Sequence, residues 1–193
     1  MRITGGSLKG RLLRVPKAGV RPTQDMVREA LFSMLVDVIP DCHFLDLYAG
    51  SGAVGMDAFS RGAAKVCWVE NHPATYGHLK KSLESMGLTG AHTVKGDVLR
   101  TQLGRLPGAP FDVIFADPPY ADACWSEDGI LQPDPCLEAL LDRIHDQSAL
   151  KTDGFVILEQ AKRSGVIVRE GWDLVRDRSY GHARILIYQH KRP

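Results

Sequence analysis

Residues 44–55 have the sequence FLDLYAGSGAVG, an apolar run that passes into a glycine-rich turn and then into a segment of small apolar residues. The apolar run predicts a buried strand, and the segment that begins at residue 53 predicts a helix. Glycines tolerate a positive φ and let the backbone approach a ligand closely. Gly50, Gly52 and Gly55 therefore predict a ligand loop at the carboxyl end of the strand, which is where ligands bind in open α/β sheets.

The glycine spacing alone fits two kinds of cofactor. It satisfies the G-x-G-x-x-G pattern of dinucleotide sites. The next predicted strand ends at Glu70, and an acid at that position fits the ribose hydroxyls of NAD or of S-adenosylmethionine (SAM) equally well. Asp46 lies four residues before Gly50. Its carboxylate suits the ammonium of an amino-acid-bearing cofactor and has no use beside a pyrophosphate, which favours SAM.

A second strand end carries the tetrapeptide Asp117-Pro118-Pro119-Tyr120, directly after the apolar run 111–116. The prolines fix φ and bias the residues before them toward extended backbone, so the tetrapeptide predicts a rigid turn. Asp117 can accept a hydrogen bond from an exocyclic amino group, and Tyr120 can stack on a planar base. The turn suits a site that holds the NH2 of a base and presents its nitrogen to an electrophile, which adds to the case for SAM.

The charge of the chain is unevenly distributed. Residues 1–24 contain six lysines and arginines and no acid, so they carry +6 while the whole chain carries +1 and the remainder −5. A short basic segment on an acidic domain is typical of contact with a phosphate backbone, although a solvated arm would have the same composition. The residues that we expect to contact nucleic acid are Arg2, Lys9, Arg11, Arg14 and Arg21.

Length and composition predict an ordinary globular protein. The chain has 193 residues, 44% hydrophobic and 24% charged, which suits one domain with a sizeable core. There is no secretory apolar segment after residue 2 and no apolar run long enough to cross a bilayer. The four cysteines lack C-x-x-C spacing, and the histidines form no metal-ligand pattern with them. We expect a cytoplasmic monomer with no bound metal and no membrane association.

Apolar runs and helical periodicity alternate from residue 43 onward, which predicts an α/β protein with a doubly wound, mostly parallel sheet. A basic β-hairpin is predicted over residues 2–15, so that residues 1–22 form an N-terminal extension and 23–193 the main domain. The predicted helices are 24–37, 53–61, 73–86 and 135–146. The predicted strands are 43–48, 66–70, 91–95, 111–116, 154–159, 172–178 and 183–189.

Together the motifs resemble a known family. Asp-x-x-x-Gly-x-Gly, an acid-ended second strand and Asp-Pro-Pro-Tyr, in this order, resemble the amino-group methyltransferases of the SAM-dependent, Rossmann-like class I. Residues 2–6, 9–11 and 21–32 and the pair Tyr180-Gly181 are similar to the bacterial 16S rRNA guanine-N2 methyltransferases. The resemblance runs nearly end to end. It implies a seven-stranded sheet with an antiparallel last strand, and methyl transfer from SAM to N2 of a guanine in 16S rRNA, within an assembling or assembled 30S particle.

The resemblance also implies roles for individual residues. The catalytic turn is Asp117, Pro118, Pro119 and Tyr120. The cofactor would be bound by Asp46, Tyr48, Gly50, Ser51, Gly52, Glu70, Asn71, Asp97, Val98 and Asp117. For Asp97 a simple turn-capping role is an equal alternative to adenine binding.

Two features depart from the family pattern. The acidic segment 121–134 with Trp125 at its centre is expected to be a surface insertion, the alternative being a lid over the site. Ala183 stands where a polar residue is expected.

Four other functions compete with this interpretation. A DNA adenine-N6 methyltransferase uses the same turn, but this chain has little room for a target-recognition region. A protein glutamine-N5 methyltransferase would leave the basic segment without a purpose. A non-catalytic RNA-binding module would not need the intact acids and glycines, and an NAD oxidoreductase would bind nicotinamide rather than SAM.

Overall fold

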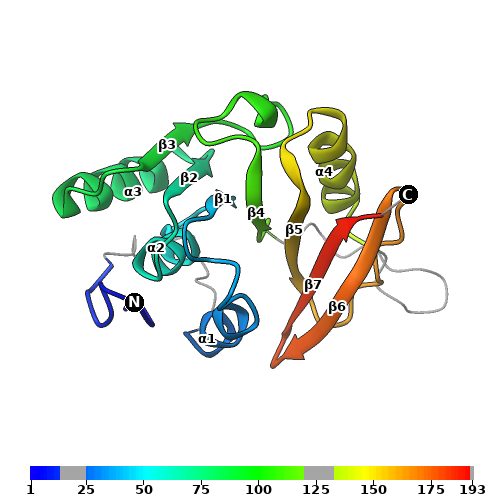
Figure 1. Ribbon diagram of the computed structural model, residues 1–193, viewed down its shortest axis with the longest axis horizontal. Coiled ribbons are helices and arrows are strands. Elements are labelled where there is room, and N and C mark those ends of the chain that lie inside the picture. The colour runs from blue at the N-terminus through cyan, green and yellow to red at the C-terminus, as the bar shows by residue number, and fades with distance from the viewer. Residues whose placement is uncertain (14–24, 120–132, 192–193) are drawn as a thin grey trace.

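Seven strands form one sheet in the order β3-β2-β1-β4-β5-β7-β6 in the computed structural model, which describes residues 1–13, 25–119 and 133–191 (Figure 1). The strands are β1 (His43–Leu47), β2 (Lys65–Glu70), β3 (Ala91–Lys95), β4 (Phe111–Ala116), β5 (Leu150–Ala161), β6 (Trp172–Tyr180) and β7 (Ala183–His190). The helices are α1 (Asp25–Met34), α2 (Ala53–Ser60), α3 (Pro73–Met86) and α4 (Pro135–Asp146), with a short 3₁₀ helix η1 (Leu103–Arg105) before β4.

The directions of the strands confirm the predicted fold class. β1 to β5 are parallel to their neighbours. β7 runs antiparallel both to β5 and to β6, so β6 points the same way as β5. The sheet is therefore the mostly parallel, Rossmann-like seven-stranded sheet with an antiparallel last strand.

Alternating side chains of the central strands enter two separate cores, because both faces of the sheet are covered. On β4, Val113 and Phe115 join the core with α1, α2 and α3. Ile114 and Ala116 join the core with α4 and η1. Such two-sided burial explains why the strand sequences are continuous apolar runs. None of the helices described is long and apolar enough to cross a membrane.

Two predicted boundaries differ from the structure by three residues or more. β5 begins at Leu150, four residues early, because Leu150 pairs with Phe111 across a bulge where the local sequence is polar. α1 ends at Met34, three residues early, because the backbone N–H groups of Val38 and Ile39 both donate to the Leu35 carbonyl and close a turn.

The predicted N-terminal hairpin is present in a short form. One antiparallel bridge joins Arg2 to Leu12, and residues 5–10 between them form bends and turns. Ile3 and Leu13 are buried in the core that also contains α1 and α2. The basic segment is therefore docked on the sheet-and-helix body over the residues described, although the proposed domain boundary at residue 22 stays a prediction.

Candidate cofactor and substrate site

Strand register brings the predicted site residues together at one edge of the sheet. Leu47, the last residue of β1, pairs with Val69 of β2 on one side and with Ala116 of β4 on the other. The next residues along the chain are Tyr48, Glu70 and Asp117, so all three lie at the carboxyl edge of the sheet. The two motifs, about seventy residues apart in sequence, thus meet where open α/β sheets bind ligands.

The turn after β1 needs the residues that it contains. Gly50 and Gly52 have φ of 53° and 77°, which favour glycine. Tyr48 has φ of 56°, an uncommon conformation for an aromatic residue, of a kind that gathers at functional sites. The indole N–H of Trp68 donates to the Gly52 carbonyl at 3.1 Å, which fixes the turn from the β2 side. The sequence analysis assigned Trp68 only to a strand and missed this contact.

Glu70 stabilises the turn after β1 by accepting a hydrogen bond from a backbone N–H of that turn. Its Oε2 accepts from the Gly50 backbone N–H at 2.8 Å, and its Oε1 accepts from the His72 N–H at 2.7 Å. Each carboxylate oxygen has a second lone pair, so these bonds leave acceptor capacity for ribose hydroxyls. Glu70 is therefore both a structural clamp and the predicted ribose acceptor.

Asp46 is a buried acid that forms no ion pair with a basic side chain among the described residues. Its Oδ2 accepts from the Gly55 backbone N–H at 2.8 Å. Burial, and to a smaller extent the charge of Glu70, raise the pKa of Asp46 from 3.8 to about 8 against the opposing effect of that hydrogen bond. A ligand ammonium at this position would restore the ionised form, so the donor set fits the amino-acid end of SAM.

Tyr48 connects the glycine turn with the start of α4. Burial raises the pKa of Tyr48, and Cys136, Asp97 and Asp134 add to that effect. Asp134 caps α4 by accepting from the Cys136 N–H at 2.8 Å. The sequence analysis did not connect the start of α4 with the site, although Asp134 before Pro135 is a recognisable helix-start signal.

The remaining predicted cofactor residues lie after β1, β2 and β3. Asp97 Oδ1 accepts from the Leu99 N–H at 2.9 Å and its side chain is 42% exposed, so the turn-capping role is present and adenine binding stays a prediction. Val98 is buried, and its part in cofactor binding stays a prediction. Asn71 is exposed beside Glu70. The Ser51 hydroxyl lies 3.9 Å from the Met1 sulfur.

The predicted catalytic turn is described in part. Asp117 is half-buried, Pro118 is buried and Pro119 is exposed. Tyr120 and most of the acidic segment, including Trp125, lie outside the described residues. On the basic segment Arg2, Lys9 and Arg11 are exposed, as RNA contact requires, whereas Arg14 and Arg21 lie outside the described residues.

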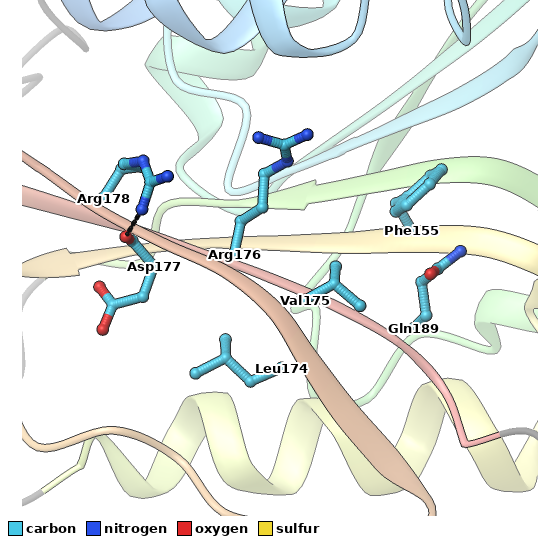
Figure 2. A pocket seen from close by; sticks show the side chains of 7 residues that line it. All are labelled: Phe155, Leu174, Val175, Arg176, Asp177, Arg178 and Gln189. Carbon is cyan, nitrogen blue, oxygen red and sulfur yellow. Dashed lines mark hydrogen bonds between the residues drawn. The ribbon is translucent and has the colours of Figure 1, made fainter.

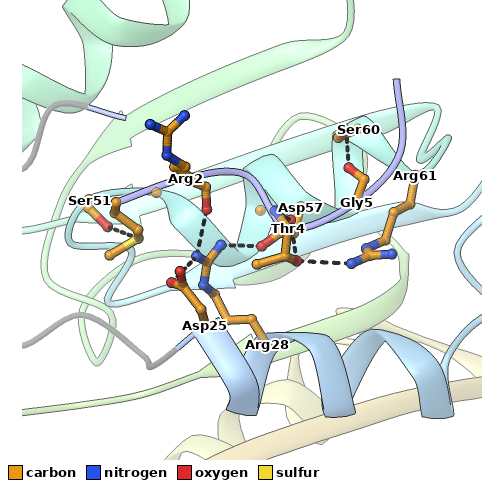
Figure 3. A network of polar contacts seen from close by, with 12 residues as sticks. Arg2, Thr4, Gly5, Asp25, Arg28, Ser51, Asp57, Ser60 and Arg61 are labelled. Carbon is orange, nitrogen blue, oxygen red and sulfur yellow. Dashed lines mark hydrogen bonds and ion pairs between the residues drawn. The ribbon is translucent and has the colours of Figure 1, made fainter. Parts of the chain in front are cut away.

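An ion-paired network that the sequence analysis missed docks the basic segment (Figure 3). Arg28 of α1 and Asp57 of α2 form an ion pair in which both side chains are 0% exposed. Arg28 also donates to the Arg2 carbonyl at 2.7 Å. Asp57 accepts from the backbone N–H and the hydroxyl of Thr4 at 2.7 and 2.8 Å. The segment is therefore fixed to the helix that begins at the glycine turn.

The sequence did contain a signal for this network. α2 is an apolar helix with one acid, and Arg28 lies between buried residues of α1. Two lone opposite charges on buried helix faces are best explained as a pair, because a single buried charge is strongly unfavourable.

The described residues contain no group of three or more histidine, cysteine or acidic side chains that could hold a metal ion. What the arrangement offers instead is a glycine turn, two acids that bond its backbone, and a proline-fixed acid across the same edge. Backbone, ammonium and ribose contacts of this kind suit SAM.

The comparisons with known proteins agree with this arrangement. The family model described as "Conserved hypothetical protein 95" matches residues 1–189. The chain is 32% identical over 191 residues to ribosomal RNA small subunit methyltransferase D of Escherichia coli, covering 98% of this chain and 89% of that protein. It is 30% identical over 192 residues to the protein of the same name from Haemophilus influenzae, covering 98% and 93%.

The solved structures that this chain resembles are also methyltransferases by their descriptions. An E. coli protein described as a proposed methyltransferase superposes with a TM-score of 0.82 and 29% identity, covering 100% of this chain and 99% of that one. A methyltransferase from Podospora anserina, solved with S-adenosylhomocysteine bound, superposes with a TM-score of 0.65 at 13% identity, covering 89% and 80%, and shares the fold. By its family model and its full-length relatives, this chain belongs to the conserved hypothetical protein 95 family, among proteins named as small-subunit ribosomal RNA methyltransferases.

Proposed function

We propose that this protein transfers the methyl group of SAM to the exocyclic N2 of a guanine in 16S rRNA, within a small-subunit particle. The observation that carries the proposal is the register of β1 and β4, which places the Asp117 turn beside Tyr48 at the start of the glycine turn. A cofactor held by one turn would therefore face a base held by the other. The names of the full-length relatives support small-subunit rRNA as the substrate class.

Four groups of this chain would hold SAM, whose sulfonium supplies an electrophilic methyl group when it is bound. Asp46 would take the ammonium, and Glu70 the ribose hydroxyls. The backbone of the glycine turn would approach the amino-acid and ribose parts closely, because Gly50 and Gly52 have no side chains. Asp97 would take the adenine, with Val98 next to it in the chain.

The catalytic contribution of the chain lies at Asp117. The lone pair of a guanine amino group is delocalised into the ring, so the nitrogen is a weak nucleophile. A carboxylate that accepts a hydrogen bond from this NH2 directs the lone pair toward the methyl group and can take up the proton that is released. Holding the two reacting atoms about 3–3.5 Å apart supplies much of the remaining acceleration.

The substrate base must be accessible before it can reach this turn. RNA bases are read specifically when they are unstacked in loops, and a stacked base must be extruded to enter such a pocket. Tyr120 would stack on the extruded base, which is worth about 1–3 kcal/mol per base. The basic segment 1–13 would hold the phosphate backbone meanwhile.

Replacement of Asp117 tests the catalytic part of this proposal. Asp117→Ala should lower methyl transfer to undermodified small-subunit particles by at least ~10²-fold, since a charge-assisted hydrogen bond of roughly 1.5–3 kcal/mol is lost together with positioning. SAM affinity, measured by calorimetry, should stay within a few-fold of the original. Asp146→Ala removes an exposed acid at the end of α4 and is the matched control. Turnover at the original rate in Asp117→Ala would contradict the role given to this residue.

A further inference from the structure

We propose that a second basic surface, at the carboxyl edge of β5 and β6, binds the phosphate backbone of the RNA substrate on the far side of the Asp117 turn from residues 1–13. The proposal rests on the proposed function and names a further part of its substrate interface. We call this surface the carboxyl-edge patch and define it as Lys162, Arg163, Arg176 and Arg178.

The local charge balance is strongly positive. Segments 161–166 and 176–184 contain five lysines and arginines and one acid, Asp177. All four residues of the patch are exposed. Within the described parts of the chain, no carboxylate lies at ion-pair distance from any of the four. Exposed cations without local acids are the footprint that phosphate binding requires.

The single acid, Asp177, lies on the other face of the sheet and forms an ion pair there with Arg184. Arg184 donates to both carboxylate oxygens of Asp177, at 2.8 and 2.6 Å. Asp177 pairs in register with Leu186, whereas Arg176 and Arg178 pair with Ile187 and Ile185, whose side chains enter the opposite core. Asp177 is therefore paired chiefly with Arg184, with a smaller electrostatic interaction with Arg178, and it offsets only a minor part of the charge of the patch. The same contacts give Arg184 a structural role.

The turns that carry the patch are tied together. The Lys162 backbone N–H donates to the His182 carbonyl at 2.8 Å, which links the end of β5 to the β6–β7 turn. Arg184 donates to the Ser164 carbonyl, also at 2.8 Å. Because these bonds fix the backbone on both sides of Lys162 and Arg163, the turn itself need not be ordered when a phosphate binds, which lowers the entropy cost of binding.

Figure 2 shows the part of the patch that lies on β6. Arg176 and Phe155 project to one side of the strands, and Asp177 projects to the other. A hollow of about 470 Å³ lies here, at a β-bulge between Leu174 and Arg176, and Arg176 and Arg178 of the patch help to line it. This part of the patch is therefore concave, as a curved backbone would require.

The position of the patch completes an interface around the Asp117 turn. β4, β5 and β6 all point to the same edge of the sheet, and β5 is the neighbour of β4 (Figure 1). Residues 1–13 lie on the other side, docked on α2 next to β1 and β2. An RNA that presents a base to Asp117 would therefore meet cations on both sides of that base, which suits folded RNA and not an isolated nucleotide.

Two charge-removal variants test the proposal. Arg163→Ala combined with Arg178→Ala removes two cations of the patch. Lys65→Ala combined with Arg105→Ala is the matched control, because these exposed residues lie at the start of β2 and just before β4, at the amino edge of the sheet. The readouts are the affinity for unmodified 16S rRNA at several salt concentrations, the KM and kcat for methyl transfer, and SAM affinity.

The patch variant should bind RNA with a salt dependence whose log–log slope is smaller by about 1.4–1.8, which corresponds to roughly 25- to 60-fold weaker binding at 0.1 M salt. KM should rise while kcat and SAM affinity stay near the original values. The control should keep the original slope. If the patch variant also keeps it, while the original protein methylates RNA, the patch proposal is wrong and the proposed function stands. If the original protein binds and methylates no RNA, both proposals fail.

Discussion

Replacing Asp46 with asparagine should make the protein more stable and at the same time weaken SAM binding. Asparagine has nearly the same shape, and its Oδ1 can still accept from the Gly55 N–H that Asp46 accepts at 2.8 Å. What changes is the charge. A residue that reduces stability but is required by the ligand is expected at a binding site, where stability and function conflict.

The size of the expected gain in folding stability follows from the pKa of Asp46. In the unfolded chain this carboxyl ionises near 3.8, whereas in the folded protein burial raises its pKa to about 8. At pH 7 the folded protein must keep protonated a group that the unfolded chain ionises fully. Neutral pH lies three units above the unfolded value, and each unit is worth about 1.4 kcal/mol, so the cost is on the order of 4 kcal/mol.

Part of this gain is offset in the variant. The asparagine NH2 costs roughly 1–3 kcal/mol if it finds no acceptor, which leaves a net stabilisation of about 1–3 kcal/mol. For a domain of this length that raises Tm by roughly 2–12 °C. The stabilisation should be largest near pH 8 and above. It should shrink and then reverse as pH falls to 4 and below, because the carboxyl becomes protonated in the folded and the unfolded chain and only the cost of the asparagine NH2 remains.

SAM binding should respond in the opposite direction. Loss of a hydrogen bond to a charged group costs about 1.5–3 kcal/mol, or roughly 10- to 150-fold in affinity. Because the ammonium favours ionised Asp46, binding should release a proton, and affinity should rise with pH between 5.5 and 7.5. The Asp46→Asn variant should lose this pH dependence.

Calorimetric titration with SAM in buffers of different ionisation enthalpy measures the proton, and thermal unfolding at several pH values measures the stability. Unchanged SAM affinity with no gain in Tm would refute the reasoning.

Two further substitutions, each with a control, test the packing of α2 against Trp68 and the ion pair that docks the basic segment. Gly55→Ala places a Cβ 2.3 Å from the Trp68 indole nitrogen, so it should destabilise the protein by about 1–3 kcal/mol and weaken SAM binding. Gly77→Ala, also inside a helix but with nothing within 4 Å, should instead stabilise by roughly 0.5–1 kcal/mol. Asp57→Asn removes the buried ion-pair partner of Arg28 and leaves it only the exposed carboxylate of Asp25, so it should cost up to about 3–5 kcal/mol in urea unfolding. The same change at the exposed pair of Asp142 should cost no more than about 1 kcal/mol, and equal losses at both sites would contradict a buried docking network.

The parallel strands could be predicted closely because their burial has a simple sequence signature. β1 and β4 are buried on both faces, and each apolar run stops where the chain leaves the sheet, at Tyr48 and at Asp117. The predicted start of β5 was wrong because its first residues are polar, and only the long-range pair between Leu150 and Phe111 makes them a strand.

The sequence predicted candidate residues of the site but not their connections. Asp46 was predicted as a cofactor ligand from its place four residues before Gly50, and Glu70 from its place at the end of a strand. Nothing in the local sequence indicated that Glu70 also bonds the backbone of the glycine turn, and Asp46 that of the helix after it. The first of these bonds is made by Gly50, which has a positive φ. Likewise, Arg28 and Asp57 meet only because two helices pack together.

The most direct test is to let the protein transfer labelled methyl groups from SAM to undermodified small-subunit particles, free 16S rRNA and DNA in parallel, and to identify the product by nucleoside mass spectrometry. The proposed function predicts label in N2-methylguanosine of the particles, and none in DNA. Label in N6-methyladenine of DNA would contradict the proposed substrate while leaving the Asp117 turn in its catalytic role. SAM binding without transfer to any of the three would contradict methylation of nucleic acid altogether.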